Sequence, residues 1–257
     1  MSIPRPHYQA TALVTGASSE IGTALAQQLG ARGHHLTLVA QHDNQREDVL
    51  EDLAESIRDQ HRVKVDVLTC DLAEPDARVA LLDQIAARER RVDVLINNAG
   101  ASTSGDFVGI ETALELRQVR VLVEAVVDLA SQVLPGMVER GEGAVLNVAS
   151  TAAMQPMPWS AGYAAAKAHT LSFSEALHHE MADRGVSVTA LCPGPSGMGI
   201  SADMVAEIAL AGLDKNRRVV VPGAMVRLTA LGSKVTPRSV QLPALRRAMR
   251  PQEVDAG

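Results

Sequence analysis

Short apolar segments alternate with helix-forming segments along most of the chain, and this alternation constrains the fold more than any other feature. The apolar segments are residues 10–15, 35–40, 63–68, 92–97, 143–150, 186–192 and 217–222. Helical patterns lie between them, at about 20–32, 44–60, 75–89, 111–139, 160–185 and 202–213. Strands that alternate with helices form a parallel sheet covered on both faces. We therefore predict an α/β Rossmann fold, doubly wound, with a seven-stranded parallel sheet and three helices on each face.

Polar or glycine-bearing motifs follow these apolar segments directly. They are TGASSEIG (15–22), Asp71-Leu72, NNAG (97–100), Ser150 and PGP (193–195). Parallel sheets bind ligands outside the carboxyl ends of their strands. A glycine-bearing turn between a strand and a helix also directs backbone N–H groups and the helix dipole outward, which suits a pyrophosphate. The motifs therefore predict one shared dinucleotide site at the carboxyl edge of the sheet.

Tyr163 and Lys167 are four residues apart at the start of a predicted helix, so their side chains share one face. A free tyrosine ionises only near pH ~10 and carries protons poorly at neutral pH. An ammonium group one turn away favours the phenolate. Ser150 can hydrogen-bond a substrate oxygen while Tyr163 gives or takes its proton. An isolated Tyr-x-x-x-Lys is usually a chance pair, but its setting after a strand-end serine favours catalysis.

Together these motifs resemble those of the short-chain dehydrogenase/reductase family, in the family's order and spacing, over roughly residues 10–222. The resemblance implies an NAD(P)-dependent oxidoreductase that interconverts a carbonyl and an alcohol, with Ser150, Tyr163 and Lys167 as catalytic residues. Lys167 would also bind the nicotinamide ribose. The implied cofactor-binding residues are Gly16, Ser18, Ser19, Ile21, Gly22, Gln41, His42, Asp71, Leu72, Asn98, Ala99, Gly100, Tyr163, Lys167, Pro193 and Gly194.

The sequence departs from the family's pattern at several places near the expected site. Glu20 stands where a glycine is usual, so its carboxylate either crowds the pyrophosphate or points to solvent. Leu122 replaces an asparagine that holds a proton-relaying water, and Met198 replaces a threonine that contacts the nicotinamide amide. The connection between Pro195 and Met204 is shorter than the family's substrate lid. A catalytically degenerate protein that senses a dinucleotide or binds a partner is therefore the alternative hypothesis.

The residues after the second apolar segment bear on cofactor choice. Relatives that use NAD usually carry an acidic residue where Ala40 stands, and relatives that use NADP carry arginines where Gln41 and His42 stand. Neither expected partner is present. Because the acidic acceptor of the ribose 2′-hydroxyl is missing, the barrier to a 2′-phosphate is removed. Gln41 and His42 can donate hydrogen bonds to that phosphate, so we favour NADP(H) over NAD(H).

Charge and cysteine content limit the other classes of function. The formal net charge of −6 argues against a general nucleic-acid binder. Cys70 and Cys192 fit neither a disulfide framework nor a zinc site. The segment His178-His179-Glu180 lacks a third ligand pattern, so we interpret it as a solvated helix face. We therefore predict no metal. The N-terminus has no apolar signal segment, and the expected location is cytoplasmic. The predicted substrate is a small carbonyl or alcohol.

The C-terminal part of the chain is basic. We predict a single domain over 1–257, with its core at about 10–222 and a C-terminal extension at 223–257. Residues 214–250 carry nine Lys or Arg against one acidic residue. We favour packing of this extension on the acidic body of its own chain or a neighbour over contact between 223–250 and a membrane. Residues 119–130 are more apolar than one buried helix face requires, which predicts a homodimer or homotetramer.

Overall fold

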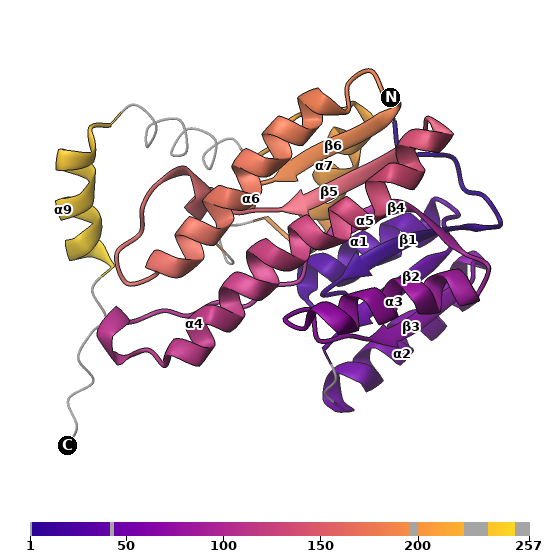
Figure 1. Ribbon diagram of the computed structural model, residues 1–257, viewed down its shortest axis with the longest axis horizontal. Helices are drawn as coiled ribbons and strands as arrows, with labels where there is room; N and C mark the ends of the chain where they lie inside the picture. The colour runs from indigo at the N-terminus through magenta and orange to yellow at the C-terminus, as the bar shows by residue number, and fades with distance from the viewer. Residues whose placement is uncertain (1, 42–43, 196–199, 224–235, 250–257) are drawn as a thin grey trace.

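The computed structural model describes residues 2–41, 44–195, 200–223 and 236–249 (Figure 1). Seven parallel strands form one sheet in the order β3-β2-β1-β4-β5-β6-β7. This order confirms the predicted doubly wound Rossmann fold, with its switch point between β1 and β4. The strands are β1 Ala10–Thr15, β2 Leu36–Ala40, β3 Val65–Thr69, β4 Arg91–Asn97, β5 Gly143–Val148, β6 Val186–Leu191 and β7 Val219–Val220.

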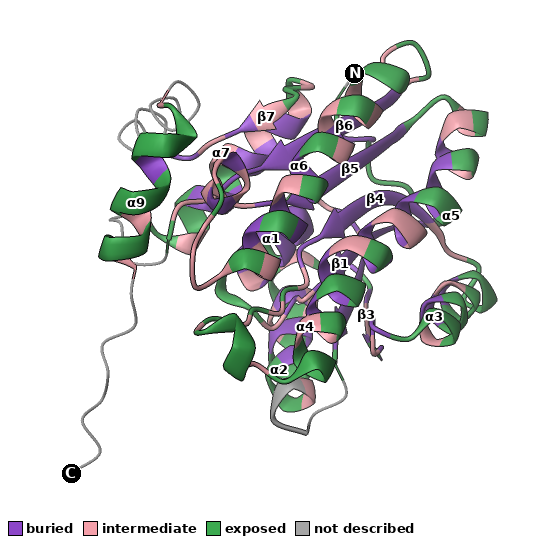
Figure 2. Cartoon of the chain, turned by 60° about the vertical axis from the view of Figure 1, so that its left-hand side comes forward, coloured by how far each residue is buried: buried purple, intermediate pink, exposed green. Residues whose placement is uncertain are grey.

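Two sets of helices cover the two faces of this sheet. The helices α1 Glu20–Ala31, α2 Asn44–His61 and α7 Ala202–Asp214 pack on one face. The helices α3 Pro75–Ala87, α5 Ala125–Arg140 and α6 Ala161–Glu180 pack on the other. Among the described residues this matches the predicted three helices on each face. Figure 2 shows buried strands between helices whose outer surfaces are exposed.

The two cores are built almost entirely from aliphatic side chains, because aromatic residues make up only 2% of the chain. All six residues of β1 are buried. Alternate residues of a strand point to opposite faces. Val14 accordingly joins the core under α1, α2 and α7, whereas Leu13 joins the core under α3, α5 and α6. Such burial on both faces explains why the strands are continuous apolar runs in the sequence.

The long helix expected at 111–139 is interrupted. It consists of α4 Thr112–Val119, a π-helical turn η2 Arg120–Glu124 and α5. The whole stretch is long and apolar enough to cross a membrane by length and composition, with a mean hydropathy of 1.6 in its most apolar window. Residues such as Leu129 and Met137 nevertheless pack in the core beside the sheet. For α5 at least, the apolar character is therefore explained by core packing.

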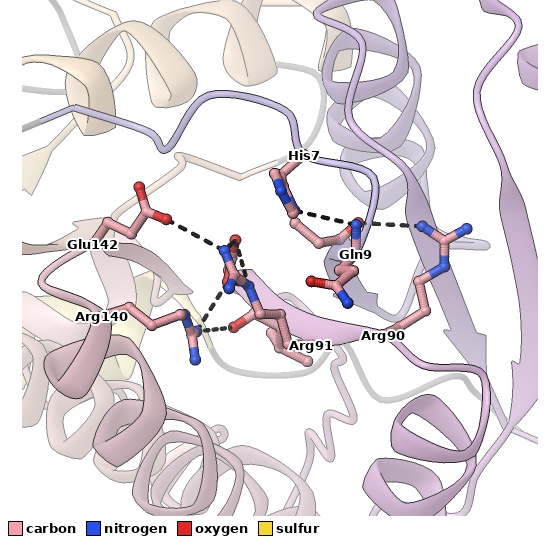
Figure 3. Close-up of polar contacts among 9 residues, drawn as sticks. His7, Gln9, Arg90, Arg91, Arg140 and Glu142 are labelled. Atoms are coloured by element: carbon pink, nitrogen blue, oxygen red, sulfur yellow. Dashed lines mark hydrogen bonds and ion pairs between the residues drawn. The ribbon is translucent and has the colours of Figure 1, made fainter.

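Charged side chains close the amino edge of the sheet, opposite the predicted site (Figure 3). The carboxylate of Asp93 in β4 is buried, and Arg140 donates to it at 2.9 Å. Arg91 lies 3.2 Å from the same carboxylate and 3.4 Å from Glu142. A buried carboxylate of this kind needs paired cations, because an uncompensated charge inside a protein is costly. These charges stabilise the amino edge of the sheet.

Three short elements complete the description. The 3-10 turns η1 Phe107–Gly109 and η3 Thr151–Met154 precede α4 and α6. The helix α9 Arg238–Ala248 lies outside the two cores and is mostly exposed (Figure 2). The last strand is shorter than the predicted 217–222 and pairs only with β6, at the edge of the sheet.

Candidate active site

Two adjoining hollows lie at the carboxyl edge of the sheet, where the motifs were predicted to meet. The larger, of about 820 Å³, is lined by the predicted residues Ser19, Ile21, Asn98, Gly100, Ser150, Tyr163, Lys167, Pro193 and Gly194. The smaller, of about 70 Å³, is lined by the predicted residues Gly16, Ser18, Gln41, Asp71, Leu72, Ala99 and Gly100. Gly100 borders both hollows. Gly22 borders neither hollow and packs against Gly16 and Asn98, and His42 lies outside the described residues.

Tyr163 and Lys167 stand one turn apart in the first part of α6. The Lys167 Nζ lies 5.9 Å from the centre of the Tyr163 ring and donates a 2.7 Å hydrogen bond to the carbonyl of Val148. The Lys167 side chain is 5% exposed, and this burial lowers its pKa to about 8. At pH 7 the lysine is therefore still mostly protonated, next to a half-buried tyrosine in the same cavity.

Ser150 follows the end of β5 and caps η3. Its Oγ accepts a 3.1 Å hydrogen bond from the N–H of Ala152. That contact uses an oxygen lone pair, so the hydroxyl proton can still be donated to a ligand. The half-buried serine lines the same cavity as Tyr163 and Lys167. The structure thus brings the three predicted catalytic residues together.

A buried polar network holds α6 against the sheet. Asn97 in β4 donates to Asn147 in β5 at 2.9 Å, and Asn147 donates to Ser174 in α6 at 2.9 Å. Thr170 of α6 also donates to the backbone carbonyl of Leu122 at 3.1 Å. All of these groups are buried, and satisfied polar networks in a core hold their members in one arrangement. The network therefore fixes the helix that carries Tyr163 and Lys167.

The glycine turn after β1 is tied to the NNAG motif after β4. Gly16 has a φ of +62°, and an added Cβ there would lie 2.6 Å from the Cα of Ala99. The Asn98 side chain donates to the carbonyls of Thr15 and Gly16 at 3.1 and 2.9 Å, and to the Ser19 Oγ at 3.0 Å. Asn98 therefore holds the glycine turn in place through its side-chain hydrogen bonds. The sequence motif did not reveal this role.

We expect Gly22→Ala to destabilise the protein by about 1–3 kcal/mol, the usual cost of overpacking. An added Cβ would lie 2.3 Å from the carbonyl oxygen of Gly16 and 2.7 Å from the Asn98 amide nitrogen. Urea unfolding would measure the loss, with Gly109→Ala as the control because its Cβ would meet nothing within 4 Å. Equal unfolding free energies for the two variants would show that the turn is not close-packed.

The smaller hollow contains an ion pair that sequence reasoning missed. Arg117 of α4 donates to both carboxylate oxygens of Asp71, at 2.8 and 2.9 Å. This hydrogen bonding lowers the pKa of Asp71 and raises that of Arg117. Arg117 is 46 residues from Asp71 in the chain, so no local motif signals the pair. The paired guanidinium and carboxylate both border the hollow, together with Gln41.

The loop that carries Leu72 is supported by a buried arginine. Arg78 of α3 is 2% exposed and donates to the carbonyl of Leu72 at 2.7 Å. Its guanidinium also pairs with Glu124 at 2.6 Å and with Asp128. Arg78 thereby ties the wall of the smaller hollow to the π turn and α5.

Of the departures from the family pattern, Glu20 borders the larger hollow. Glu20 is the first residue of α1, is exposed and lines the cavity. A carboxylate at a helix N-terminus interacts favourably with the helix dipole, so Glu20 competes with a bound anion there. Leu122 is 1% exposed, within η2, where its side chain has no group to hold a water. Met198 lies outside the described residues.

The histidine pair in α6 requires a correction. His178 was expected on a solvated helix face, but it is half-buried and its Nδ1 lies 2.8 Å from the carbonyl of Val188. Only His179 and Glu180 are exposed there. Adjacent residues on a helix point in different directions, so His178 can face β6 while His179 and Glu180 face solvent. Within the described parts of the chain, no group of three His, Cys, Asp or Glu side chains is placed to hold a metal. Cys192 is buried beside the sheet, as a small residue would be.

The fold and the two hollows fit a dinucleotide. Gly16, with its left-handed φ, and Gly22 let the turn pack closely against Asn98 and Ala99 at the N-terminus of α1, where backbone N–H groups can face a phosphate. These features define the class of dinucleotide-binding Rossmann proteins. The family model described as short chain dehydrogenase matches residues 10–209. The chain belongs to this family of nicotinamide-dependent oxidoreductases, which confirms the resemblance noted in its motifs.

Relatives include both enzymes and a protein named inactive. A putative ketoacyl reductase of Streptomyces coelicolor is 36% identical over 185 residues, which cover 71% of this chain and 69% of that protein. The inactive hydroxysteroid dehydrogenase-like protein 1 of Homo sapiens is 31% identical over 72% of this chain, but only 56% of its own length is matched. A short-chain dehydrogenase from Sphingobium yanoikuyae in complex with NADPH is 30% identical, with a TM-score of 0.76, 96% of this chain covered and 99% of that chain.

Proposed function

We propose that the protein is an NADP(H)-dependent oxidoreductase that interconverts a carbonyl and an alcohol. The observation that carries this proposal is the shared cavity of Ser150, Tyr163 and Lys167, in which the lysine is buried one turn from the tyrosine. A positioned acid/base beside a hydrogen-bond donor is what reduction of a carbonyl requires. The ketoacyl reductase relative supports the same class of reaction.

Each of the three cavity residues has a separate role in the proposed reaction. Ser150 donates a hydrogen bond to the substrate oxygen, and Tyr163 gives that oxygen its proton in reduction or removes it in oxidation. Lys167, anchored on the Val148 carbonyl, places a positive charge beside the phenol. A bound nicotinamide dinucleotide supplies or accepts the hydride at the substrate carbon.

In this proposal, different parts of the cofactor bind in the two hollows. The turn of Gly16, Ser18, Ser19, Ile21 and Gly22 holds the pyrophosphate at the N-terminus of α1. Asp71, Leu72 and Ala99 border the adenosine part, and Pro193 and Gly194 border the nicotinamide part. The site is tested by a panel of carbonyls and alcohols, followed by the absorbance of NADPH or NADH. Cofactor oxidation in the presence of at least one carbonyl supports the enzyme.

We expect NADPH to bind on the order of tenfold more tightly than NADH, because a 2′-phosphate gains hydrogen bonds and meets no acidic residue at Ala40 or Gln41. Calorimetric titration of both cofactors measures the difference. Ala40→Asp is the matched variant, since an acidic residue there accepts the ribose 2′-hydroxyl and repels the phosphate. It should reverse the preference. Tighter binding of NADH by the wild-type protein would contradict the proposal.

A second candidate function is a catalytically degenerate protein that senses a dinucleotide or binds a partner. Glu20 at the anion site and Leu122 in place of the relay residue favour it, as does the relative named inactive. Cofactor binding without turnover on any substrate of the panel would support dinucleotide sensing. If neither cofactor binds at millimolar concentration, the partner-binding alternative replaces the enzyme.

Self-association is proposed through α4 and the segment before it. Val108, Leu116 and Leu114 are apolar side chains that are 91, 53 and 50% exposed. Covering them with a second copy would remove these side chains from water. We expect light scattering at micromolar concentration to give a dimer or tetramer of the 27.2 kDa chain. A monomer would contradict the assembly, and Val108→Glu should weaken it.

A further inference from the structure

The helix α9 touches the wall of the active-site cavity. It lies beside the 155–161 segment that joins η3 to α6 (Figure 1). Gln241 of α9 donates a 2.6 Å hydrogen bond to the side chain of Gln155, which lines the cavity of Ser150 and Tyr163. Farther along α9, the carbonyl of Arg246 accepts a hydrogen bond from the Trp159 indole at 3.4 Å. The helix thus contacts one short segment at two points.

The contact at Gln241 is specific. Gln241 is 8% exposed, although its neighbours Val240 and Leu242 are 63 and 38% exposed. Its side-chain oxygen also accepts a 2.7 Å hydrogen bond from Arg238. A buried amide is costly unless it is hydrogen-bonded. The bond to Gln155 therefore favours the observed position of α9 over positions in which Gln241 would be buried without this partner.

A second cavity, of about 240 Å³, lies where α9, the 158–161 residues and the segment before α4 meet. Its apolar lining comes from Phe107, Ile110, Pro158 and Trp159. Arg246 also borders it, but so do the carboxylates of Asp106 and Glu115, so the charges do not favour an anion. The segment between the two cavities is short, since Met157 lines the first and Pro158 the second.

Trp159 has a backbone conformation that a bulky residue rarely adopts. Its φ is +68°, in the left-handed region. The Trp159 carbonyl accepts a 2.8 Å hydrogen bond from the N–H of Gly105, and the indole bond to Arg246 fixes the other end of the residue. Strained residues held by their surroundings are concentrated at ligand sites. The strain therefore points to a function for Trp159.

We propose that the second cavity and α9 form a distal substrate site, which selects carbonyl compounds with an extended, uncharged apolar substituent. This inference rests on the proposed oxidoreductase function. The reacting carbonyl lies at Ser150 and Tyr163, and the apolar substituent passes Met157, whose unbranched side chain adapts readily, to reach Trp159. The helix α9 is held by Gln241 and borders the second cavity through Arg246.

Binding can be measured without turnover, because Trp159 is the one tryptophan of the chain. We expect 2-undecanone to change the Trp159 emission saturably in the absence of cofactor, whereas acetone leaves it unchanged. Gln241→Leu should weaken 2-undecanone binding at least tenfold. Arg247→Gln is the control, because Arg247 is exposed on α9 and borders neither cavity. Thermal unfolding checks that both variants are folded. Absence of a saturable change, or equal affinity in both variants, would overturn the distal site.

A second measurement separates this inference from the proposed function. With cofactor present, wild-type kcat/KM should rise at least tenfold from 2-butanone to 2-undecanone. Gln241→Leu should remove most of that rise, whereas Arg247→Gln should leave the values for both ketones unchanged. Turnover that is independent of chain length overturns the distal site and leaves the oxidoreductase function standing. Saturable emission changes without turnover of any ketone support the binding site and refute the reaction.

Discussion

Replacing Tyr163 by phenylalanine is expected to lower kcat for carbonyl reduction by a factor of about 10²–10⁴, the usual contribution of a positioned acid/base. The substitution removes only the phenol oxygen, from a half-buried side chain that lines the cavity with Ser150 and Lys167. Stability and cofactor affinity should change little, because the ring that contacts its surroundings is retained. The loss should therefore lie in kcat and not in KM.

Tyr8→Phe is the matched control, because Tyr8 is the other of the two tyrosines in the chain and is 71% exposed. It should leave kcat unchanged. Assays at saturating NADPH, with calorimetric cofactor titrations of both variants, separate chemistry from binding. Undiminished kcat in Tyr163→Phe would move the acid/base role to another residue. A loss of cofactor affinity in place of kcat would make Tyr163 a binding residue.

The sequence predicts the fold and the grouping of the motifs at one edge of the sheet, because both depend on local patterns. Strands buried on both faces, such as β1 and β5, appear as uninterrupted apolar runs. Motifs that follow parallel strands meet at one edge once the strand order is known. The position of Ser150 near Tyr163 therefore follows from the order of the elements.

Side-chain partners that lie far apart in the chain escape the same reasoning. The bond of Arg117 to Asp71 and that of Gln241 to Gln155 join residues 46 and 86 positions apart, which no periodicity connects. The π turn at η2 also has no simple sequence signal, since its residues read as ordinary helix. The role of α9 near the cavity could not be inferred, because a basic extension alone does not indicate which surface it covers.

The buried Lys167 has an energetic consequence that is separate from its role in catalysis. Burial lowers the pKa of Lys167 from 10.5 to about 8. Between these two pH values the unfolded chain binds a proton that the folded chain does not, so stability rises with pH across this window. Below pH 8 both states are protonated, and the cost of the buried ammonium is fully present. Above pH 10.5 neither state is protonated, and the cost disappears.

Lys167→Met should therefore make the cofactor-free protein more stable at pH 7, by roughly 1–3 kcal/mol, while kcat falls on the order of 100-fold or more. The upper value is the pKa shift converted to free energy, and the lower value allows for the lost hydrogen bond to Val148. The stability gain should shrink as the pH rises from 8 to 10.5 and vanish above 10.5, because the wild-type lysine is then neutral in both states. Lys215→Met is the control, since Lys215 is exposed and its replacement should change neither activity nor the pH dependence. Urea unfolding of the three proteins between pH 7 and 10.5 measures the difference. A variant that is less stable than wild type at pH 7 would show that the ammonium is stabilised in place, and Lys167 would then be a structural residue as well as a catalytic one.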